Sequence, residues 1–318
     1  MRFVLTEDQR DFGGSLDALL SGADTVGAAR AWAEGDTAPG LELWRRLAEQ
    51  GVNALVVPEE HGGMGATAVE LVVAFEALGR HGVPGPWVES AAYLPLALAD
   101  ADLLAALAEG AVGTVAEAAH APYALDAEVA DHVFSCTGTT LRTATRGERL
   151  RSVDRTRHLT TLVAGDPVPG ADLGAALESA VLATSAQLLG CGERLLDDAV
   201  AYVKQRRQFG REIGSYQAIK HALADVRIAL DFARPLVLGA ALGEVPAAAA
   251  KVACADAAYL ASRTALQVHG AVGYTQELDL SIWITKVRAL VTAWGTPAQH
   301  RAALLETLVA AAGTPVEA

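Results

Sequence analysis

The spacing of apolar residues divides the chain into two helical regions with a strand-like stretch between them. In the first region apolar residues recur three and four positions apart, which predicts helices over residues 3–20, 41–50, 68–79 and 87–110. Thr6, followed by acidic residues, is typical of a helix start. Pro95 is expected to start or kink an element. The Gly-, Ala- and Asp-rich segment 21–40 predicts a loop.

From residue 111 the pattern changes to short runs rich in Val, Phe and Thr, separated by turns. These runs predict strands near residues 112–116, 133–136, 139–143 and 159–163. Residues 142–158 contain six arginines, and we expect them to form a solvated sheet edge, because charged edge strands deter aggregation. The part of this segment over residues 151–158 has no role that the sequence assigns.

The helical pattern returns at residue 171 and continues to the end of the chain. It predicts one long or two shorter helices over 173–205, then helices over 215–242, 246–269, 278–290 and 298–311. The predicted fold class is therefore mainly α with a small β insert. We expect a helical domain over residues 1–110, a β domain over 111–169 and a four-helix bundle over 170–318.

Composition and charge narrow the class of protein further. Ala dominates the 318 residues and aromatic residues are few, which favours helices over a β-sandwich. A net charge of −13 argues against non-specific binding to nucleic acid or to an anionic membrane, but not against a local basic pocket. The N-terminal segment does not resemble a signal peptide, and no apolar run reaches the roughly 20 residues that cross a bilayer.

The three cysteines are widely spaced and form no metal-ligand pattern: Cys136, Cys191 and Cys254. Reduced, buried thiols are the expected state, which is consistent with a cytoplasmic protein and with no metal site.

The segment 202–226 contains the first candidate site. Arg206 and Arg207 precede Phe209 and Gly210, and Gln217 follows after a short loop. Paired guanidinium donors, an aromatic ring and a flexible glycine suit a ligand with phosphates and a flat ring. The alternative is a capped, solvated helix end, where basic residues complement the helix dipole.

Two further segments could contribute to a site. Gln267, Gly270 and Gly273 combine an amide with glycines that allow close backbone approach, although a plain helix cap would look the same. His269 beside them is more typical of a satisfied, half-buried histidine than of a catalyst. Near the C-terminus Trp294 precedes a Gly-Thr turn that resembles a helix N-cap. The sequence contains no pattern typical of a Ser-His-Asp triad or a P-loop.

Over nearly its whole length the chain resembles the acyl-CoA dehydrogenase family. The N-terminal half carries the resemblance in LTEDQRDF, WRRLAEQGVNALVVPEEHGGMGA and AFEALGR. The C-terminal half carries it in RRQFG, YQAIKHALADV and ALQVHGAVGYTQE. The resemblance implies FAD at a dimer interface and oxidation of an acyl-CoA thioester to the 2-enoyl-CoA. A carboxylate removes the α-proton in that reaction, and the flavin takes a hydride from the β-carbon.

The same resemblance implies a cofactor role for several residues of this chain. Arg206 would contact the FAD pyrophosphate, with Phe209 and Gln217 alongside. The rest of that arm would be lined by Gln267, Gly270 and Gly273. In the family this group reaches across to FAD held mainly by the neighbouring subunit, whereas Thr296 matches a residue that helps bind the subunit's own FAD.

The chain departs from the family at the catalytic positions. The family's glutamate directly precedes the Gly-Thr that is Gly295-Thr296 here, and this chain has Trp294, whose indole has no basic site. Some members place the glutamate at the position of Ala180. Glu178 is nearby, but two residues rotate a side chain by about 200° around a helix. The β insert is about half the family's length and lacks the Thr-Glu-Pro and Gly-Ser-Asp run that holds the flavin ring.

These matches and departures lead to three hypotheses. In the leading one the chain is the non-base subunit of a heteromer and resembles the short subunits of actinobacterial α2β2 enzymes of steroid breakdown. An acyl-CoA dehydrogenase-like partner would then hold flavin, acyl-CoA and base, Trp294 would fill the vestigial pocket, and an electron-transfer flavoprotein would be the acceptor. The alternatives are a self-sufficient homodimer with a relocated base, Glu178, and a catalytically inactive scaffold.

Overall fold

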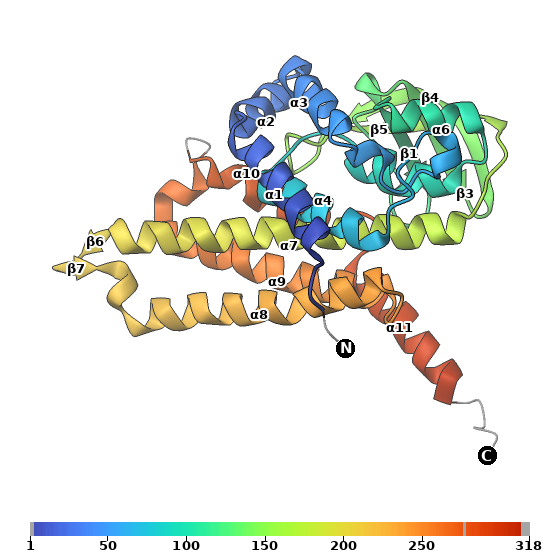
Figure 1. Cartoon of the computed structure of the whole chain (residues 1–318). Coiled ribbons are helices and arrows are strands. Elements are labelled where there is room, and N and C mark those ends of the chain that lie inside the picture. The colour runs from blue at the N-terminus through green and yellow to red at the C-terminus, as the bar shows by residue number, and fades with distance from the viewer. Residues whose placement is uncertain (1–2, 276–277, 313–318) are drawn as a thin grey trace.

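The structure, a computed structural model, describes residues 3–275 and 278–312 and begins with a layer of helices (Figure 1). The helices of this N-terminal part are α1 (Glu7–Ser21), α2 (Thr25–Ala33), α3 (Ala38–Glu49), α4 (Ala68–Arg80), α5 (Leu94–Ala97) and α6 (Ala101–Ala108), with short turns η1 (Val52–Ala54) and η2 (Glu59–His61) and a π-helical turn η3 (Glu89–Tyr93). Thr6 caps α1 in a capping box with Gln9, as the sequence predicted for this helix start.

One prediction for this part is wrong. The segment 21–40 is not a loop, because it contains α2, which Asp24 caps and whose Trp32 is fully buried. The helical segment predicted over 87–110 is divided into several elements: the chain leaves helical geometry at Leu98 and starts again where Asp100 accepts hydrogen bonds from the N–H groups of Asp102 and Leu103. Pro95 lies in the first turn of α5, where proline is tolerated.

A five-stranded sheet covers one side of the molecule. Its strands are β1 (Gly113–Glu117), β2 (Ala124–Leu125), β3 (His132–Thr137), β4 (Thr140–Leu150) and β5 (Leu159–Pro167), in the order β1-β3-β4-β5-β2. The arginine-rich β4 is therefore the middle strand and not the predicted edge. It pairs antiparallel with both β3 and β5, and most of its side chains are exposed because one side of the sheet faces water.

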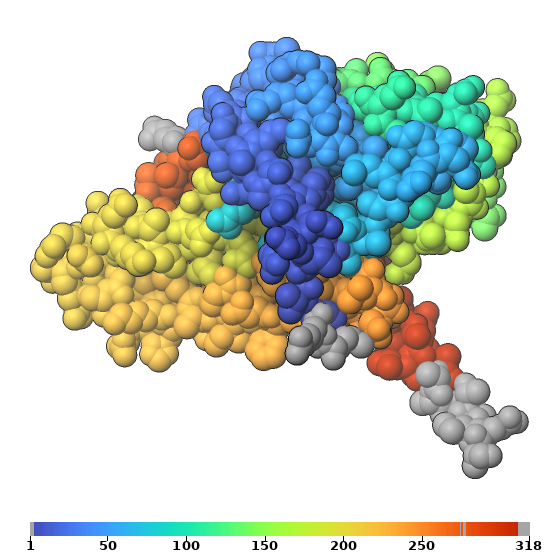
Figure 2. Space-filling view, in the orientation of Figure 1, coloured from blue at the N-terminus to red at the C-terminus, as the bar shows by residue number. Residues whose placement is uncertain are grey.

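The C-terminal part is an antiparallel bundle. It consists of α7 (Leu173–Gln205), α8 (Gln217–Ala241), α9 (Ala247–His269) and α10 (Leu280–Leu290), followed by α11 (Pro297–Ala312). A small hairpin, β6 (Arg207–Gln208) and β7 (Arg211–Glu212), joins α7 to α8 and marks one end of the bundle, while α11 projects away from the body (Figures 1 and 2). This arrangement confirms the predicted fold class.

The 33-residue α7 is one continuous helix at the centre of the molecule. Gly79 and Gly190 let α4 and α7 cross closely, since a Cβ at Gly190 would lie 2.0 Å from the Glu76 carbonyl oxygen. By length and composition α7 could cross a membrane, contrary to the sequence expectation, but 67% of its most apolar 18-residue window is buried. That burial is typical of a core helix.

Candidate functional site

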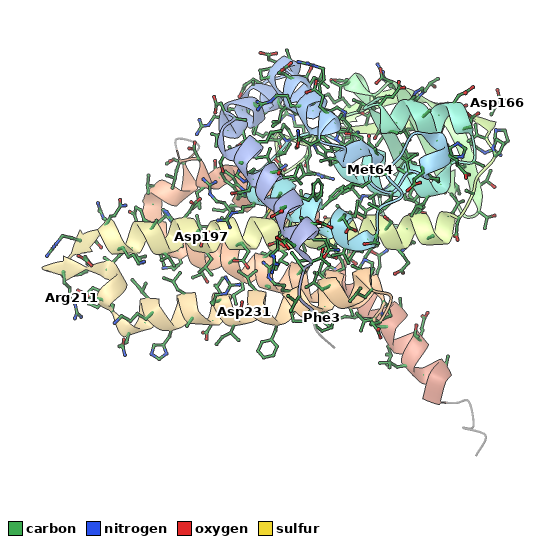
Figure 3. The ribbon with its side chains drawn as sticks, viewed as in Figure 1. Phe3, Met64, Asp166, Asp197, Arg211 and Asp231 are labelled. Carbon is green, nitrogen blue, oxygen red and sulfur yellow. The ribbon has the colours of Figure 1, made fainter. Side chains whose placement is uncertain are left out.

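The β6-β7 hairpin presents its side chains at the far end of the bundle. Arg206 ends α7, and Gln208 pairs with Arg211 across a two-residue turn. The turn residues Phe209 and Gly210 have φ values of 51° and 82°, the pattern of a type I′ hairpin. The Phe209 ring is 90% exposed, and a left-handed conformation costs a non-glycine residue about 1 kcal/mol. Figure 3 shows Arg211 at this tip. Strain combined with an exposed ring is typical of a contact surface.

A stacked pair of rings brings the second predicted segment to the same end. Tyr202 of α7 stacks on His269 of α9 with ring centroids 4.1 Å apart. His269 is buried and its Nδ1 lies 2.7 Å from the carbonyl oxygen of Ala265, so it is a satisfied histidine. Gly270 adopts φ 64° and ψ −141°, a conformation that favours glycine. Gly270 and Gly273 lie in the short helical turn η6 (Gly270–Tyr274), and the last two residues of the ALQVHGAVGYTQE motif lie outside the described residues.

The polar members of this group face outward. Arg206, Gln217 and Gln267 are all exposed. Within residues 3–275 and 278–312 the Arg206 guanidinium forms no ion pair or hydrogen bond. A guanidinium on an open surface, with no partner among the described residues, can bind the diphosphate of a ligand that is held mainly by another subunit. The group fits one face of a phosphate-bearing cofactor.

Trp294 forms the inner wall of a cavity between the β domain and the bundle. Its side chain is 1% exposed, its φ is 56°, and its ring centroid lies 4.9 Å from that of Tyr93. About 510 Å³ remains open beside it, between Tyr123, Arg157 and Arg288. Trp294 therefore closes the inner side of this region without filling it.

Glu89 lies at the floor of the same cavity and was not identified from the sequence. It is 3% exposed, and within the described part of the chain its Oε2 has no hydrogen-bond partner. Burial raises the pKa of its carboxyl group, and the charge of Arg157 opposes the rise. Its signal in the sequence was an isolated acid in the otherwise apolar run 86–99.

The turn after Trp294 is fixed from two sides. The Lys251 ammonium group is fully buried and donates to the carbonyl oxygens of Ala293 and Gly295, and burial lowers its pKa to about 7. Thr296 forms a capping box with Gln299 at the start of α11, with its Oγ1 accepting from the Gln299 N–H at 3.2 Å. The Thr296 hydroxyl, predicted to help bind the subunit's own FAD, is thus engaged in helix capping.

Glu178 has a structural partner. Its carboxylate accepts a hydrogen bond of 3.1 Å from the N–H of Ala247, the first residue of α9. A carboxylate at a helix N-terminus is stabilising. Glu178 is exposed and does not line the cavity beside Trp294, and Ala180 is fully buried in α7. This position gives no support to Glu178 as a relocated base.

A helical part, a small sheet and a helical bundle follow one another along the chain. The chain belongs to the acyl-CoA dehydrogenase family: the family's N-terminal domain profile matches residues 6–99 and its C-terminal domain profile matches residues 173–309. The resemblance drawn from the sequence is thereby confirmed, as is FAD as the cofactor. The chain is 34% identical over 287 residues to the acyl-CoA dehydrogenase IpdE2 of Mycobacterium tuberculosis, covering 87% of this chain and 89% of that protein.

Solved structures share the fold. The ChsE4-ChsE5 complex from Mycobacterium tuberculosis superposes with a TM-score of 0.82 at 23% identity, covering 99% of this chain and 100% of the matched chain. Butyryl-CoA dehydrogenase from Megasphaera elsdenii gives a TM-score of 0.80 at 21% identity, covering 97% of this chain and 100% of the matched chain. A steroid acyl-CoA dehydrogenase variant, Tcur3481-Tcur3483, gives 0.82 at 22%, covering 97% of this chain and 99% of the matched chain.

Proposed function

We propose that this chain is the subunit of a heteromeric acyl-CoA dehydrogenase that lacks the catalytic base and completes the FAD site of a second, acyl-CoA dehydrogenase-like subunit. One pairing of features carries the proposal. Arg206 is exposed at the hairpin end of the bundle and has no ion pair or hydrogen bond to any residue that the structure describes, yet a buried Trp294 stands where the family has its glutamate. A self-sufficient enzyme needs both parts, whereas a completing subunit needs only the first.

The residues at the end of the bundle that carries the β6-β7 hairpin suit the diphosphate arm of FAD. Arg206 can donate two parallel hydrogen bonds to phosphate oxygens. The exposed Phe209 ring offers a flat apolar surface, and Gln217 and Gln267 offer amides beside it. Apart from residues adjacent to it in the chain, no described residue has an atom within 4 Å of the place where a Cβ of Gly270 would stand, so its backbone is open to a ligand. When bound, FAD supplies the hydride-accepting chemistry for desaturation of the thioester.

The chemistry at the α-carbon is assigned to the partner. Trp294 cannot accept a proton, and Glu178 caps α9. In this proposal the partner contributes the carboxylate, the flavin-ring pocket and the acyl-CoA site. Electrons pass to an electron-transfer flavoprotein in the cytoplasm. A steroid-derived CoA thioester is the proposed substrate class, supported by the likeness to a structure described as a steroid acyl-CoA dehydrogenase.

An exposed apolar face on α8 and α9 supports assembly with a second subunit. Phe232 is 74% exposed, Ile228 is 53% exposed and Leu260 is 38% exposed. A groove of about 560 Å³ runs beside Phe232 between the two helices. The projecting α11 adds exposed Leu305 and Leu308. The apolar side chains that line the α8-α9 groove, Phe232 and Leu260 among them, are typical of an association surface.

Phe232→Asp should prevent association with the partner subunit. A charge in the centre of an apolar interface costs several kcal/mol, so we expect the dissociation constant to rise at least about 100-fold. Size-exclusion chromatography and native mass spectrometry of the co-expressed chains measure the change. Val163→Asp, at a residue that is 62% exposed on the sheet, is the matched control and should leave assembly intact. A Phe232→Asp variant that assembles as well as this control would remove the α8-α9 face from the proposal.

A further inference from the structure

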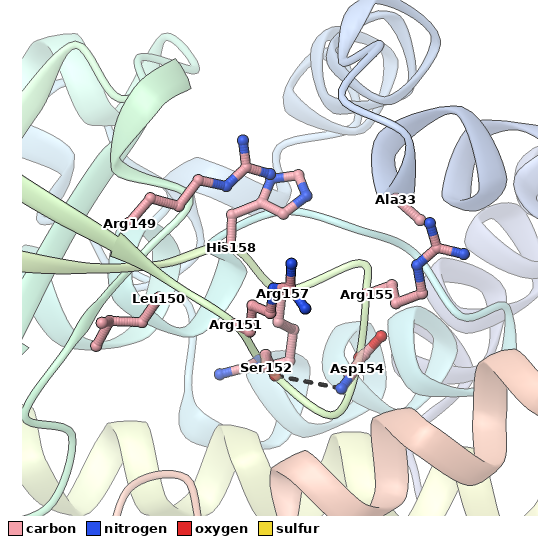
Figure 4. Close-up of a pocket in the computed structure, with 9 residues that line it drawn as sticks. All are labelled: Ala33, Arg149, Leu150, Arg151, Ser152, Asp154, Arg155, Arg157 and His158. Carbon is pink, nitrogen blue, oxygen red and sulfur yellow. Dashed lines mark hydrogen bonds between the residues drawn. The ribbon is translucent and has the colours of Figure 1, made fainter.

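The loop between β4 and β5, to which the sequence assigned no role, forms a basic pocket. The pocket holds about 470 Å³ and lies against α2 (Figure 4). It is lined by four arginines and one histidine: Arg149, Arg151, Arg155, Arg157 and His158. A group of cations this dense attracts anions locally, although the chain as a whole has a net charge of −13.

Two of the arginines are held at the rim by acids, and two are not. Arg149 pairs with Glu128 at 3.3 Å and Arg155 pairs with Glu34 at 2.8 Å, both in exposed positions. In the described part of the chain the side chains of Arg151 and Arg157 form no ion pair or hydrogen bond. Arg157 is half-buried, so an anion that accepted two hydrogen bonds from it would be bound strongly.

Buried acids lie near these arginines and offset part of their charge: Asp154 lines the pocket itself, and the charge of Arg157 opposes the rise in pKa that burial causes at Glu89 and Asp126. Asp154 is fully buried, accepts hydrogen bonds from the Thr156 N–H and hydroxyl at 2.9 and 2.8 Å, and lies 3.7 Å from the Lys286 ammonium group. Asp126 is 1% exposed and accepts from Trp32 Nε1 at 3.0 Å. Both carboxylates therefore fix the loop from inside.

His158 adds a buried, unpartnered atom to the pocket wall. The residue is 7% exposed, its Nδ1 lies 3.3 Å from Asp126 Oδ1, and its Nε2 has no hydrogen-bond partner among the residues that the structure describes. Burial and the charge of Arg149 lower the pKa of the imidazole. In a neutral ring with its proton on Nδ1, Nε2 can accept a hydrogen bond from a ligand hydroxyl.

We propose that this pocket binds the phosphate groups of a nucleotide-type ligand, with Arg151 and Arg157 as the phosphate donors and His158 as an acceptor for a ligand hydroxyl. Arg151 and Arg157 also line the neighbouring cavity of about 510 Å³, which offers the aromatic side chains of Tyr123 and Trp294. Phosphates in the first pocket and a ring in the second would occupy both. The site is separate from the β6-β7 hairpin, which lies at the far end of the bundle (Figure 1).

Calorimetric titration at low salt tests the site. The assembled complex is titrated with inorganic phosphate, pyrophosphate and ADP, against a chloride solution of equal ionic strength. We expect ADP and pyrophosphate to bind, and Arg151→Gln and Arg157→Gln each to weaken binding at least about tenfold, in line with the strength of charge-assisted hydrogen bonds. Arg151→Lys should retain part of the affinity. Arg10→Gln, an exposed arginine on α1, is the matched control and should change nothing.

The comparison of ligands and variants decides the outcome. ADP binding more tightly than pyrophosphate supports a nucleotide, and equal affinities support a free phosphate source at the same site. Equal responses to pyrophosphate and chloride, or unchanged binding in the Arg151→Gln, Arg157→Gln double variant, would overturn the proposal. The flavin content of each variant is recorded and should not change, so that this result stays independent of the FAD role given to Arg206.

Discussion

Arg206→Ala should remove most of the flavin from the assembled enzyme while leaving this chain folded. The guanidinium is exposed after the last turn of α7 and pairs with none of the described residues, so its loss should change the free energy of unfolding by less than about 0.5 kcal/mol. The loss of a bidentate hydrogen bond to a diphosphate should cost about 2–3 kcal/mol, or roughly 30- to 150-fold in FAD affinity. Flavin absorbance of the purified complex and fluorescence titration with FAD measure this loss.

Arg207→Ala is the matched control for this prediction. Arg207 carries the same charge in the same hairpin, and side chains of successive extended residues point to opposite sides. We expect the Arg207 variant to keep its flavin. If Arg206→Ala kept the full flavin content, the scaffold hypothesis would replace the proposed cofactor role.

Trp294→Ala should destabilise the fold strongly. The indole is 1% exposed and packs on Tyr93, and Lys251 fixes the carbonyl groups on both sides of it, so the walls cannot collapse into the space. Deleting a buried tryptophan side chain costs about 3–5 kcal/mol. In a domain of this size each kcal/mol lowers the melting temperature by about 2–4 °C. Thermal unfolding followed by circular dichroism measures the shift.

Two control variants show whether the loss of stability comes from the packing of the Trp294 ring. Trp294→Phe keeps a ring against Tyr93 and should lose less than half as much stability. Tyr123→Ala alters the same cavity at a residue that is 43% exposed and should lose little. A Trp294→Ala variant that melted at the wild-type temperature would show that Trp294 does not close the cavity.

The sequence predicted those elements that can be recognised from a short stretch of neighbouring residues. Apolar periodicity predicted the bundle helices. Motif resemblance assigned Arg206 and Gly270 to one cofactor group, and the structure places their segments at the same end of the bundle, while their cofactor role stays a prediction. The sequence pattern missed α2, which has nine residues, mostly small ones, and takes its burial from Trp32, whose indole donates to Asp126 94 positions later. Such a contact leaves no periodic trace in the local sequence.

Strand order and cavity walls depended on long-range contacts. β4 resembles an edge strand by its arginines, but its place in the sheet is set by pairing with β5 on one side and β3 on the other. The two-residue β2 that forms one edge is too short to give a pattern. Glu89, Arg157 and Trp294 meet in one cavity although they lie far apart in the chain, so the sequence could not identify the site that they form.

The most direct test of the proposed function is the flavin content and acyl-CoA oxidation of the purified chain, alone and co-purified with its partner. We expect the chain alone to be colourless and inactive. With the partner we expect a yellow, active complex that contains one FAD for each pair of unlike subunits. A yellow homodimer of this chain that oxidises an acyl-CoA without any partner would contradict the proposal.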